Sequence, residues 1–457
     1  MTKYLFTLLL FLLCTAGFSQ DKNEDMIRKI YDEALANGQS YEMLEYLTTR
    51  IGHRLSGSPQ AAAAVEWTRQ QMEQLGFDTV FLQPVMVPHW VRGEKEVVRL
   101  INSSTYGSRE LHSLALGNSV GSGPQGVSAE IVEVQNFDEL DKLGKAGIQG
   151  KIVFFNRPMD PKLIHTFQAY GGAVNQRGQG ASRAAAYGAV AVLVRSMASN
   201  NDDVPHTGSL RYDPNQPQIP AVAISTNDAN LLSDVLKKEG SARVYLETHC
   251  EMLPDILSYN VIGEIRGTQN KEEYIVVGGH LDSWDVGQGA HDDGSGCVQA
   301  IEAVRILKSL NYKPKHSIRA VMFMNEENGL RGGREYAAQA STLGQPHIAA
   351  IESDAGGFTP RGFTITGNEA QTAKLKSWGQ WLAPYGLHDL GSPGGGADIG
   401  PLRESGTVLF GLRPDSQRYF NYHHTEEDTF DKIDKRELEL GAAAMSALIY
   451  LIDSEGL

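Results

Sequence analysis

The sequence predicts an α/β protein built on a mainly parallel, mixed β-sheet that is covered by helices. Short apolar runs typical of buried strands occur at 274–277, 318–324, 348–351 and 408–412, and segments with helical periodicity lie between them. Strands that alternate with helices favour parallel pairing with helices on both faces of the sheet. In open sheets of this kind, ligands bind beyond the carboxyl ends of the strands, and the polar motifs of this chain fall there.

The composition is that of a folded protein with more than one domain. The chain has 457 residues, of which 41% are hydrophobic and 21% are charged, and domains usually contain about 100 to 200 residues. The formal net charge of -14 argues against binding to nucleic acid or to an anionic membrane, and it suits a site for cations. The three cysteines, Cys14, Cys250 and Cys297, are too few for a disulfide framework; the last two are expected either to pair or to remain buried thiols.

Residues 1–19 are predicted to be a signal peptide. Lys3 is followed by an apolar run over 4–13 and then by small residues as far as Ser19, which is the layout of a secretory signal. The apolar run is about half the roughly 20 residues that cross a bilayer, and no other segment of the sequence is long and apolar enough. We therefore expect no stable membrane span and an exported protein, either periplasmic or secreted.

The rest of the chain changes character twice. Residues 24–75 have helical apolar spacing, and Gly76 is a natural end to this helical segment. From Ala129 to Cys250, short strands and a helix rich in alanine and glycine indicate a small α/β unit. All the strong chemical motifs follow Tyr259. The sequence thus predicts a catalytic domain formed by 20–110 and 251–457, interrupted by an insert domain of 111–250.

Polar clusters follow the predicted strands of the catalytic domain. Each cluster alone has an ordinary explanation, such as a helix cap or a solvated acidic loop, but their joint occurrence at successive strand ends indicates a metal site. If strand geometry persists past His280, the side chain of Asp282 points the same way and can accept the second ring N–H of that histidine. The clusters are Gly278–Asp282, Gly289–Gly296, Asn325–Gly329, Ser353–Gly357 and Tyr422–Thr429.

The candidate metal ligands are two imidazoles and three carboxylates. This mixed nitrogen and oxygen set suits Zn²⁺ and lacks the thiolates of most structural zinc sites. If one carboxylate bridges, each of two Zn²⁺ ions receives three protein ligands and keeps an open position, so that the pair can activate a shared water for attack on a carbonyl group. Glu326, next to a ligand but unbound, would take the proton of that water. The assignment is His280, Asp292 and Asp354 on one ion, and Asp292, Glu327 and His424 on the other.

The order of these motifs resembles the M28 metallopeptidases, which are zinc aminopeptidases and carboxypeptidases with a co-catalytic metal pair. The matching motifs are His-x-Asp, Asp-Asp-Gly-Ser-Gly, Asn-Glu-Glu, Ser-Asp-x-Gly-Gly and His-Thr-x-x-Asp-Thr; residues 87–93 and the insert resemble the plasma glutamate carboxypeptidase group. The resemblance covers nearly the whole mature chain. It implies a zinc-exopeptidase-like fold with a protease-associated insert, the five ligands above, Glu326 as general base, Asp282 as partner of the first ligand, and a cis peptide bond after Asp292.

The resemblance also implies an exopeptidase that acts on dipeptides or short peptides, and a homodimer. His423 stands where relatives often carry tyrosine, so it is a candidate for stabilising the oxyanion. Asp398, within the glycine-rich loop 394–401, is a candidate for lining the substrate pocket, although a plain turn explains this loop equally well. The alternatives are an aminopeptidase on longer peptides, a glutaminyl-cyclase-like transferase with a single zinc, and an inactive binding protein. The complete set of five ligands argues against the last two.

Overall fold

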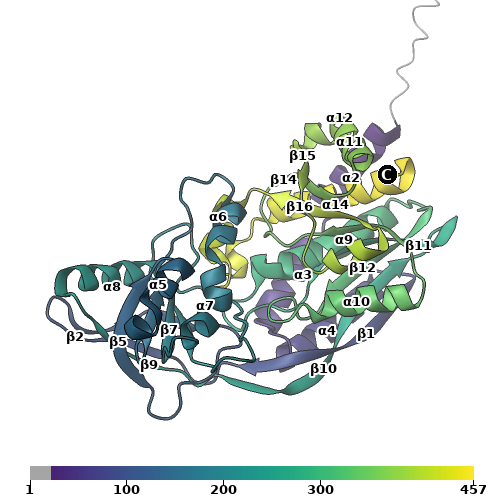
Figure 1. Ribbon diagram of the computed structural model, residues 1–457. Helices are drawn as coiled ribbons and strands as arrows, with labels where there is room; N and C mark the ends of the chain where they lie inside the picture. The colour runs from purple at the N-terminus through teal and green to yellow at the C-terminus, as the bar shows by residue number, and fades with distance from the viewer. Residues whose placement is uncertain (1–21) are drawn as a thin grey trace, which may run out of the picture.

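Two mixed β-sheets of eight strands each form the framework of the computed structural model, which describes residues 22–457 (Figure 1). The predicted signal peptide and Cys14 lie outside the described residues. The second sheet is formed by a continuous stretch of the chain that leaves the first sheet and returns to it. We refer to the first sheet with its helices as the first unit and to the second sheet with its helices as the second unit.

The first sheet has the mainly parallel, mixed arrangement that the sequence predicts. Its four central strands, β12, β11, β13 and β16, are parallel, whereas β10 pairs antiparallel with β12 and β14 pairs antiparallel with β16. In spatial order, the strands are β1 (Thr79–Val91), β10 (Glu251–Ile265), β12 (His316–Phe323), β11 (Asn270–His280), β13 (His347–Glu352), β16 (Val408–Pro414), β14 (Pro360–Thr366) and β15 (Asp389–Pro393).

Both faces of the first sheet are buried under helices, as a continuous apolar strand requires. In β11, Ile275 and Val277 join the core beneath one layer of helices, while Val276 between them packs with Val321 and Tyr336 on the opposite face. Each fully buried aliphatic side chain of this kind contributes about 1.5 to 3 kcal/mol. The first layer includes α9 (Ser295–Ser309) and α14 (Lys435–Glu455); the opposite layer includes α10 (Arg331–Thr342).

The amino-terminal helical segment covers the same face as α9 and α14. Ser58 caps α4 by accepting a hydrogen bond from the N–H of Ala61, and Gly76 adopts a left-handed conformation (φ 73°) just after that helix ends. The helices are α2 (Lys22–Asn37), α3 (Ser40–Tyr46), a π-helical turn (Leu47–Ile51) and α4 (Pro59–Gln74). Three short helices belong to the later part of this unit: α11 (Glu369–Ser377), α12 (Gly379–Leu382) and α13 (Tyr419–Tyr422).

The long antiparallel strands β1 and β10 connect the two units: the chain enters the second unit after β1 and returns to the first along β10 (Figure 1). Its sheet begins before residue 111, the predicted start of the insert, because the turn at 103–107 connects two strands of this sheet instead of two domains. In spatial order, its strands are β3 (Gly107–Leu111), β2 (Val97–Ser103), β9 (Arg243–Glu247), β5 (Val127–Val134), β6 (Ile152–Phe155), β7 (Ala191–Arg195), β8 (Ala221–Ile224) and β4 (Ser113–Ala115). Its helices are α5 (Phe137–Ile148), α6 (Thr166–Ala173), α7 (Asn175–Ala185) and α8 (Thr226–Glu239).

The two units share an apolar contact beside the carboxyl ends of the central strands. The core of the second unit includes Phe358, Tyr419 and Phe420 of the first. At the same junction, the ring of Phe167 on α6 stacks on Tyr419 with centroids 5.2 Å apart, and the hydroxyl of Thr166 donates to the carbonyl oxygen of Ser416. Helix α6 consequently lies against the segment that leads to the candidate ligand His424.

Cys250 and Cys297 are both buried and both free, so the two thiols do not pair. The thiol of Cys297 instead donates to the carbonyl oxygen of His280 at 3.0 Å. Within residues 22–457, no helix combines the length and the apolar character that crossing a membrane requires.

Candidate metal centre

The predicted ligands meet at the carboxyl ends of the parallel strands of the first sheet. His280 is the last residue of β11, Asp354 follows β13, and Glu327 lies in the turn after β12. Asp292 comes from the turn at 290–294 that leads into α9, where its own backbone is not helical (φ −120°, ψ 93°), and His424 follows α13 with a left-handed backbone (φ 63°). Residues up to 144 positions apart in sequence are thereby brought together, as the sheet topology predicts.

Asp292 lies at the centre of this cluster. One of its carboxylate oxygens, Oδ1, is 3.1 Å from Nε2 of His280, and the other, Oδ2, is 3.2 Å from Nε2 of His424. Asp354 approaches His280 to 3.5 Å, and Glu327 approaches His424 to 3.2 Å. Burial alone would raise the pKa of Asp292, but the two imidazoles hold it well below its usual range. The peptide bond after Asp292 is cis, as the resemblance implies.

The cluster fits a metal centre by its donor atoms. Two sets of three side chains each place all their donor atoms within 4.8 Å of one another, and both sets contain Asp292. Oδ2 of Asp292 and Oε1 of Glu327 are buried without a hydrogen-bond partner among residues 22–457. A buried carboxylate oxygen without a hydrogen bond is costly unless a cation neutralises it. The sets are His280, Asp292 and Asp354, and Asp292, His423 and His424.

Both ligand histidines are oriented by main-chain carbonyl groups. Nδ1 of His280 is 2.9 Å from the carbonyl oxygen of Asp282, and Nδ1 of His424 is 3.2 Å from that of Thr207. When each Nε2 faces a metal, each Nδ1 carries the proton and donates it to this carbonyl. Thr207 also donates its own N–H to the carbonyl oxygen of His424 at 3.0 Å. Because Thr207 belongs to the second unit, both units hold this histidine in place.

The side chain of Asp282 has a different contact from the predicted one. Its Oδ1 is 3.9 Å from Nδ1 of His280, too far for a hydrogen bond, because β11 ends at His280 and the alternation of side chains ends with it. The carboxylate instead accepts hydrogen bonds from the backbone N–H groups of Asn325 (2.7 Å) and Glu326 (3.0 Å). Asp282 thus fixes the turn that carries the predicted base and one predicted ligand.

Two residues that sequence reasoning missed shape the loop before Asp292. The carboxylate of Asp428 accepts hydrogen bonds from the N–H groups of His291 (2.7 Å) and Asp292 (3.1 Å). Arg54, which is 0% exposed, donates to the carbonyl oxygens of Leu281, Gln288 and Gly289 at 2.6 to 2.9 Å. The motif His-Thr-x-x-Asp-Thr contained a signal for Asp428, whereas no motif surrounds Arg54.

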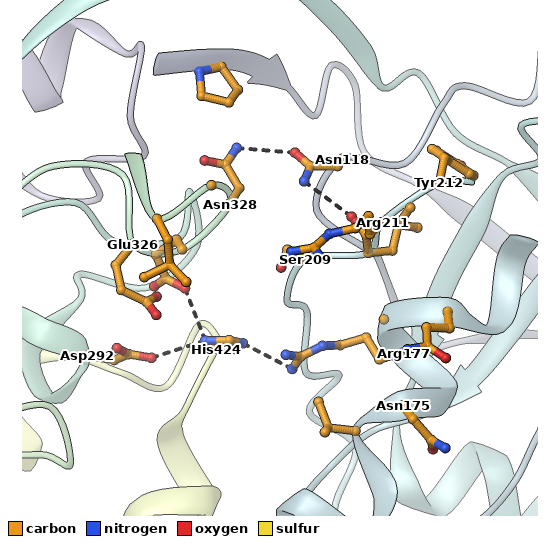
Figure 2. A pocket seen from close by; sticks show the side chains of 18 of the residues that line it. Asn118, Asn175, Arg177, Ser209, Arg211, Tyr212, Asp292, Glu326, Asn328 and His424 are labelled. Atoms are coloured by element: carbon orange, nitrogen blue, oxygen red, sulfur yellow. Dashed lines mark hydrogen bonds and ion pairs between the residues drawn. The ribbon is translucent and has the colours of Figure 1, made fainter. Parts of the chain in front are cut away.

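A cleft of about 940 Å³ opens onto the cluster between the two units. Figure 2 shows Asp292, Glu326 and His424 on one side of the cleft and Asn175, Arg177 and Arg211 on the other. The partly exposed carboxylate of Glu326 lines the cleft. Burial raises its pKa well above the usual range, and the carboxylates of Asp354 and Glu327 raise it further. Glu326 is therefore positioned to exchange protons with a molecule in the cleft.

His423 and Asp398 have different surroundings. His423 lines the cleft, its ring stacks on that of His424 with centroids 3.5 Å apart, and its Nε2 is 3.7 Å from Asp292. Asp398 is 1% exposed and is not among the residues that line the cleft. The backbone N–H groups that flank it, those of Ala397 and Ile399, bind the carboxylate of Glu352, so the glycine-rich loop holds a buried side chain.

Comparison with known proteins gives consistent matches. The profile of Peptidase family M28 matches residues 260–449. Carboxypeptidase Q of Bos taurus is 35% identical over 420 residues, which cover 91% of this chain and 86% of that protein. The crystal structure of a peptidase M28 precursor from Shewanella amazonensis is 32% identical, with a TM-score of 0.88 over 94% of this chain and 96% of that one. A zinc aminopeptidase from Bacillus subtilis, BSAP, shares the fold at 22% identity, with a TM-score of 0.65 over 90% of this chain and 94% of that one.

Proposed function

The chain belongs to peptidase family M28, and from this premise we propose that it is an exported di-zinc exopeptidase that hydrolyses dipeptides or short peptides. As a family member it is a metallo-exopeptidase, and peptides are its substrates. The observation that supports the finer proposal is the position of Asp292, whose two carboxylate oxygens face two different histidines. This is the arrangement that a carboxylate bridging two ions requires.

In this proposal, His280, Asp292 and Asp354 hold one zinc ion, and Asp292, Glu327 and His424 hold the other. Zinc is the metal in the name of the Bacillus subtilis aminopeptidase with the same fold, and the nitrogen and oxygen donors suit it. When bound, zinc supplies Lewis-acid chemistry, which lowers the pKa of water and stabilises negative charge on the attacked carbonyl oxygen.

The protein's own groups perform the proton transfers. The carboxylate of Glu326 accepts a proton from the attacking water and passes it to the nitrogen of the leaving amine. Asp282 keeps Glu326 in position through the N–H of that residue. His423, which lines the cleft beside Asp292, is the proposed donor to the developing oxyanion through Nε2.

The test is a measurement of metal content and hydrolysis on the same protein sample. The substrate panel contains free dipeptides, the same dipeptides with blocked ends, and longer peptides with free amino termini. Two zinc ions per chain and hydrolysis restricted to short peptides with free ends are expected. Efficient removal of single residues from long peptides would favour the aminopeptidase alternative, and hydrolysis of no peptide by the zinc-loaded protein would refute the proposal.

We also propose that the second unit is a protease-associated-like domain that forms one wall of the cleft, and that the enzyme is an exported homodimer. The protein should then appear in the periplasm or the medium with its amino terminus just after Ser19, which mass spectrometry can determine. Light scattering on that protein should give twice the mass of one chain. A protein retained in the cytoplasm with Met1 in place would contradict export. A mass equal to that of one chain would contradict the homodimer.

A further inference from the structure

Arg177 is a buried cation at the wall of the cleft opposite the carboxylates of the metal cluster. It belongs to α7 of the second unit, is 7% exposed, and lines the cleft. In Figure 2 its side chain extends from α7 toward His424. The other ring nitrogen of His424 faces Asp292, and Glu326 lies on that same side of the cleft. None of the catalytic steps described above uses this guanidinium.

The hydrogen bonds of Arg177 leave part of its guanidinium without an acceptor. Nη2 donates to the hydroxyl of Tyr170 at 2.6 Å, and Nη1 has a long contact of 3.4 Å with the carbonyl oxygen of Thr207. Nε is buried without a partner, and no carboxylate among residues 22–457 forms an ion pair with this side chain. Nη1 is also 3.4 Å from Nδ1 of His424, but that nitrogen carries a proton when Nε2 faces a metal, and it then accepts nothing.

Other arginines that are buried in this protein have abundant acceptors. Arg305 pairs with two glutamates at 2.7 to 2.9 Å, and Arg54 donates to three carbonyl oxygens. A buried charge normally requires such partners, because its removal from water is costly. Arg177 also lies over the ring of Tyr170, with Cζ 5.5 Å from the ring centroid, but no anionic partner accompanies it, so its guanidinium retains capacity for an anionic group in the cleft.

The cleft is lined by charged side chains of both signs. Apart from the carboxylates and histidines at the metal cluster, the titratable cationic or anionic side chains that line the cleft are all arginines. One of these, Arg331, is paired with Asp255 at 3.4 Å. Of these arginines, Arg177 and Arg211 lie on the wall opposite the metal cluster (Figure 2), which favours a substrate with a negative end there. The arginines are Arg177, Arg211, Arg331 and Arg334.

We propose that Arg177 binds the free carboxyl-terminal carboxylate of the substrate and thereby selects short peptides with an unblocked end. This inference rests on the proposed exopeptidase function. The guanidinium is separated from Asp292 and Glu327 by the width of the His424 ring. One extended residue spans about 3.3 to 3.6 Å, so a peptide with its scissile carbonyl at the cluster places the carboxylate of the next residue near Arg177. Arginine is suited to this role because its planar fork binds a carboxylate through two hydrogen bonds.

The experiment compares alanyl-alanine with alanyl-alaninamide, which differ only in the charge of the carboxyl end. For Arg177→Met, we expect kcat/KM on alanyl-alanine to fall by about 10- to 100-fold, since hydrogen bonds to charged groups contribute about 1.5 to 3 kcal/mol. Its kcat/KM on the amide should stay close to the wild-type value. Arg177→Lys keeps the charge but loses the planar fork, so its kcat/KM on alanyl-alanine should lie between those of the wild type and Arg177→Met. Arg183→Lys, on the same helix but paired at the surface with Asp141, is the matched control.

Two outcomes would overturn the inference. If Arg177→Met lowers kcat/KM equally on both substrates, Arg177 acts through His424. If it lowers kcat/KM on neither substrate, Arg177 has no role in substrate selection. Misfolding is not expected for Arg177→Met, because exchanging an incompletely paired buried charge for an apolar side chain of similar length removes a desolvation cost. Equal elution volume and circular dichroism would verify the fold of the variant.

A binding measurement separates failure of this inference from failure of the proposed function. In the Glu326→Gln background, which lacks the proposed base, calorimetry gives the dissociation constants of alanyl-alanine and its amide with and without Arg177→Met. Preferential loss of binding for the free acid supports the carboxylate site, and an unchanged preference refutes it. If the zinc-loaded wild-type enzyme hydrolyses neither compound, the proposed function fails, while the calorimetric comparison still decides the role of Arg177.

Discussion

The carboxylate of Asp282 accepts a hydrogen bond from the backbone N–H of Glu326 at 3.0 Å. The same carboxylate accepts a second hydrogen bond from the N–H of Asn325 at 2.7 Å. An ionised carboxylate is an acceptor only, so it matches a turn that presents successive N–H groups. Asp282 therefore positions the proposed base through the backbone of the turn after β12, in addition to any effect on His280.

Replacement of Asp282 by asparagine should lower kcat by about 10- to 100-fold. The amide group offers one acceptor instead of two and turns an N–H₂ group toward backbone donors, so the turn that carries Glu326 shifts. KM and zinc content should change less than kcat, and steady-state kinetics with elemental analysis would measure all three. Asp141→Asn, which affects only surface contacts with Arg183 and Tyr187, is the control. An unchanged kcat in Asp282→Asn would contradict the positioning role.

Glu326→Gln and Glu327→Gln should differ although the two residues are adjacent. The first removes the proposed base, so turnover should fall by about 10² to 10⁴-fold while zinc content is unchanged. The second removes a proposed ligand, so zinc should be lost together with activity. Elemental analysis of gel-filtered protein and single-turnover hydrolysis provide the two readouts. Near-normal turnover in Glu326→Gln would show that another group is the base.

The central position of Asp292 predicts a particular pattern of metal loss. His280→Ala and His424→Ala should each retain about one ion per chain, because each removes a ligand from one site only. Asp292→Ala should lose both ions, since its two oxygens face different histidines. Zinc per chain, measured after dialysis against dilute chelator, distinguishes these outcomes. Two ions retained by folded Asp292→Ala protein would exclude the bridge.

Arg54→Met should destabilise the protein by about 3 kcal/mol or more. The substitution leaves three carbonyl oxygens of the loop before Asp292 without donors, and each unsatisfied buried group costs about 1 to 3 kcal/mol. Urea denaturation would give the free energy of unfolding. Arg50→Met, at an exposed position close in sequence, should change it by less than about 0.5 kcal/mol. Equal stabilities of the two variants would disprove the structural role of Arg54.

Glu439 should make the stability of the protein depend on pH. Burial raises its pKa from 4.5 to about 7, and Glu302 nearby adds to the shift. The folded protein thus binds more protons at this site than the unfolded chain between pH 4.5 and 7, so this contribution to stability is present at low pH and is lost as the pH rises.

The measurement is the free energy of unfolding of the wild type relative to Glu439→Gln, whose amide cannot ionise. Glu439→Gln should be the more stable at pH 8, by at most about 3 kcal/mol, and the difference should shrink toward pH 5. Glu45→Gln, at an exposed position on α3, should show no such trend. A difference independent of pH would mean that the carboxyl group of Glu439 does not titrate in this range.

The sequence was informative where a side chain follows a buried strand directly. His280 and Asp354 are recognisable because polar residues terminate apolar runs, and parallel strands bring such ends to the same edge of the sheet. The predicted contact between the side chain of Asp282 and the ring of His280 was wrong, because the apolar periodicity of the sequence does not indicate that β11 ends at His280. The glycine-rich loop around Asp398 showed no local sign that its backbone N–H groups bind the carboxylate of Glu352, because that partner lies more than 40 residues earlier in the chain.

The sequence by itself determined the class of fold, the order of the strands along the chain and the chemical types of the proposed metal ligands. Those properties are local, since they depend on apolar runs and on the residues next to them. Only the tertiary structure decided that Thr207 orients His424 and that Arg177 faces the same histidine. These contacts join parts of the chain more than 200 residues apart, and one of them uses a main-chain oxygen that every residue possesses. No local pattern distinguishes such groups, because their roles arise from the packing of the second unit over the first.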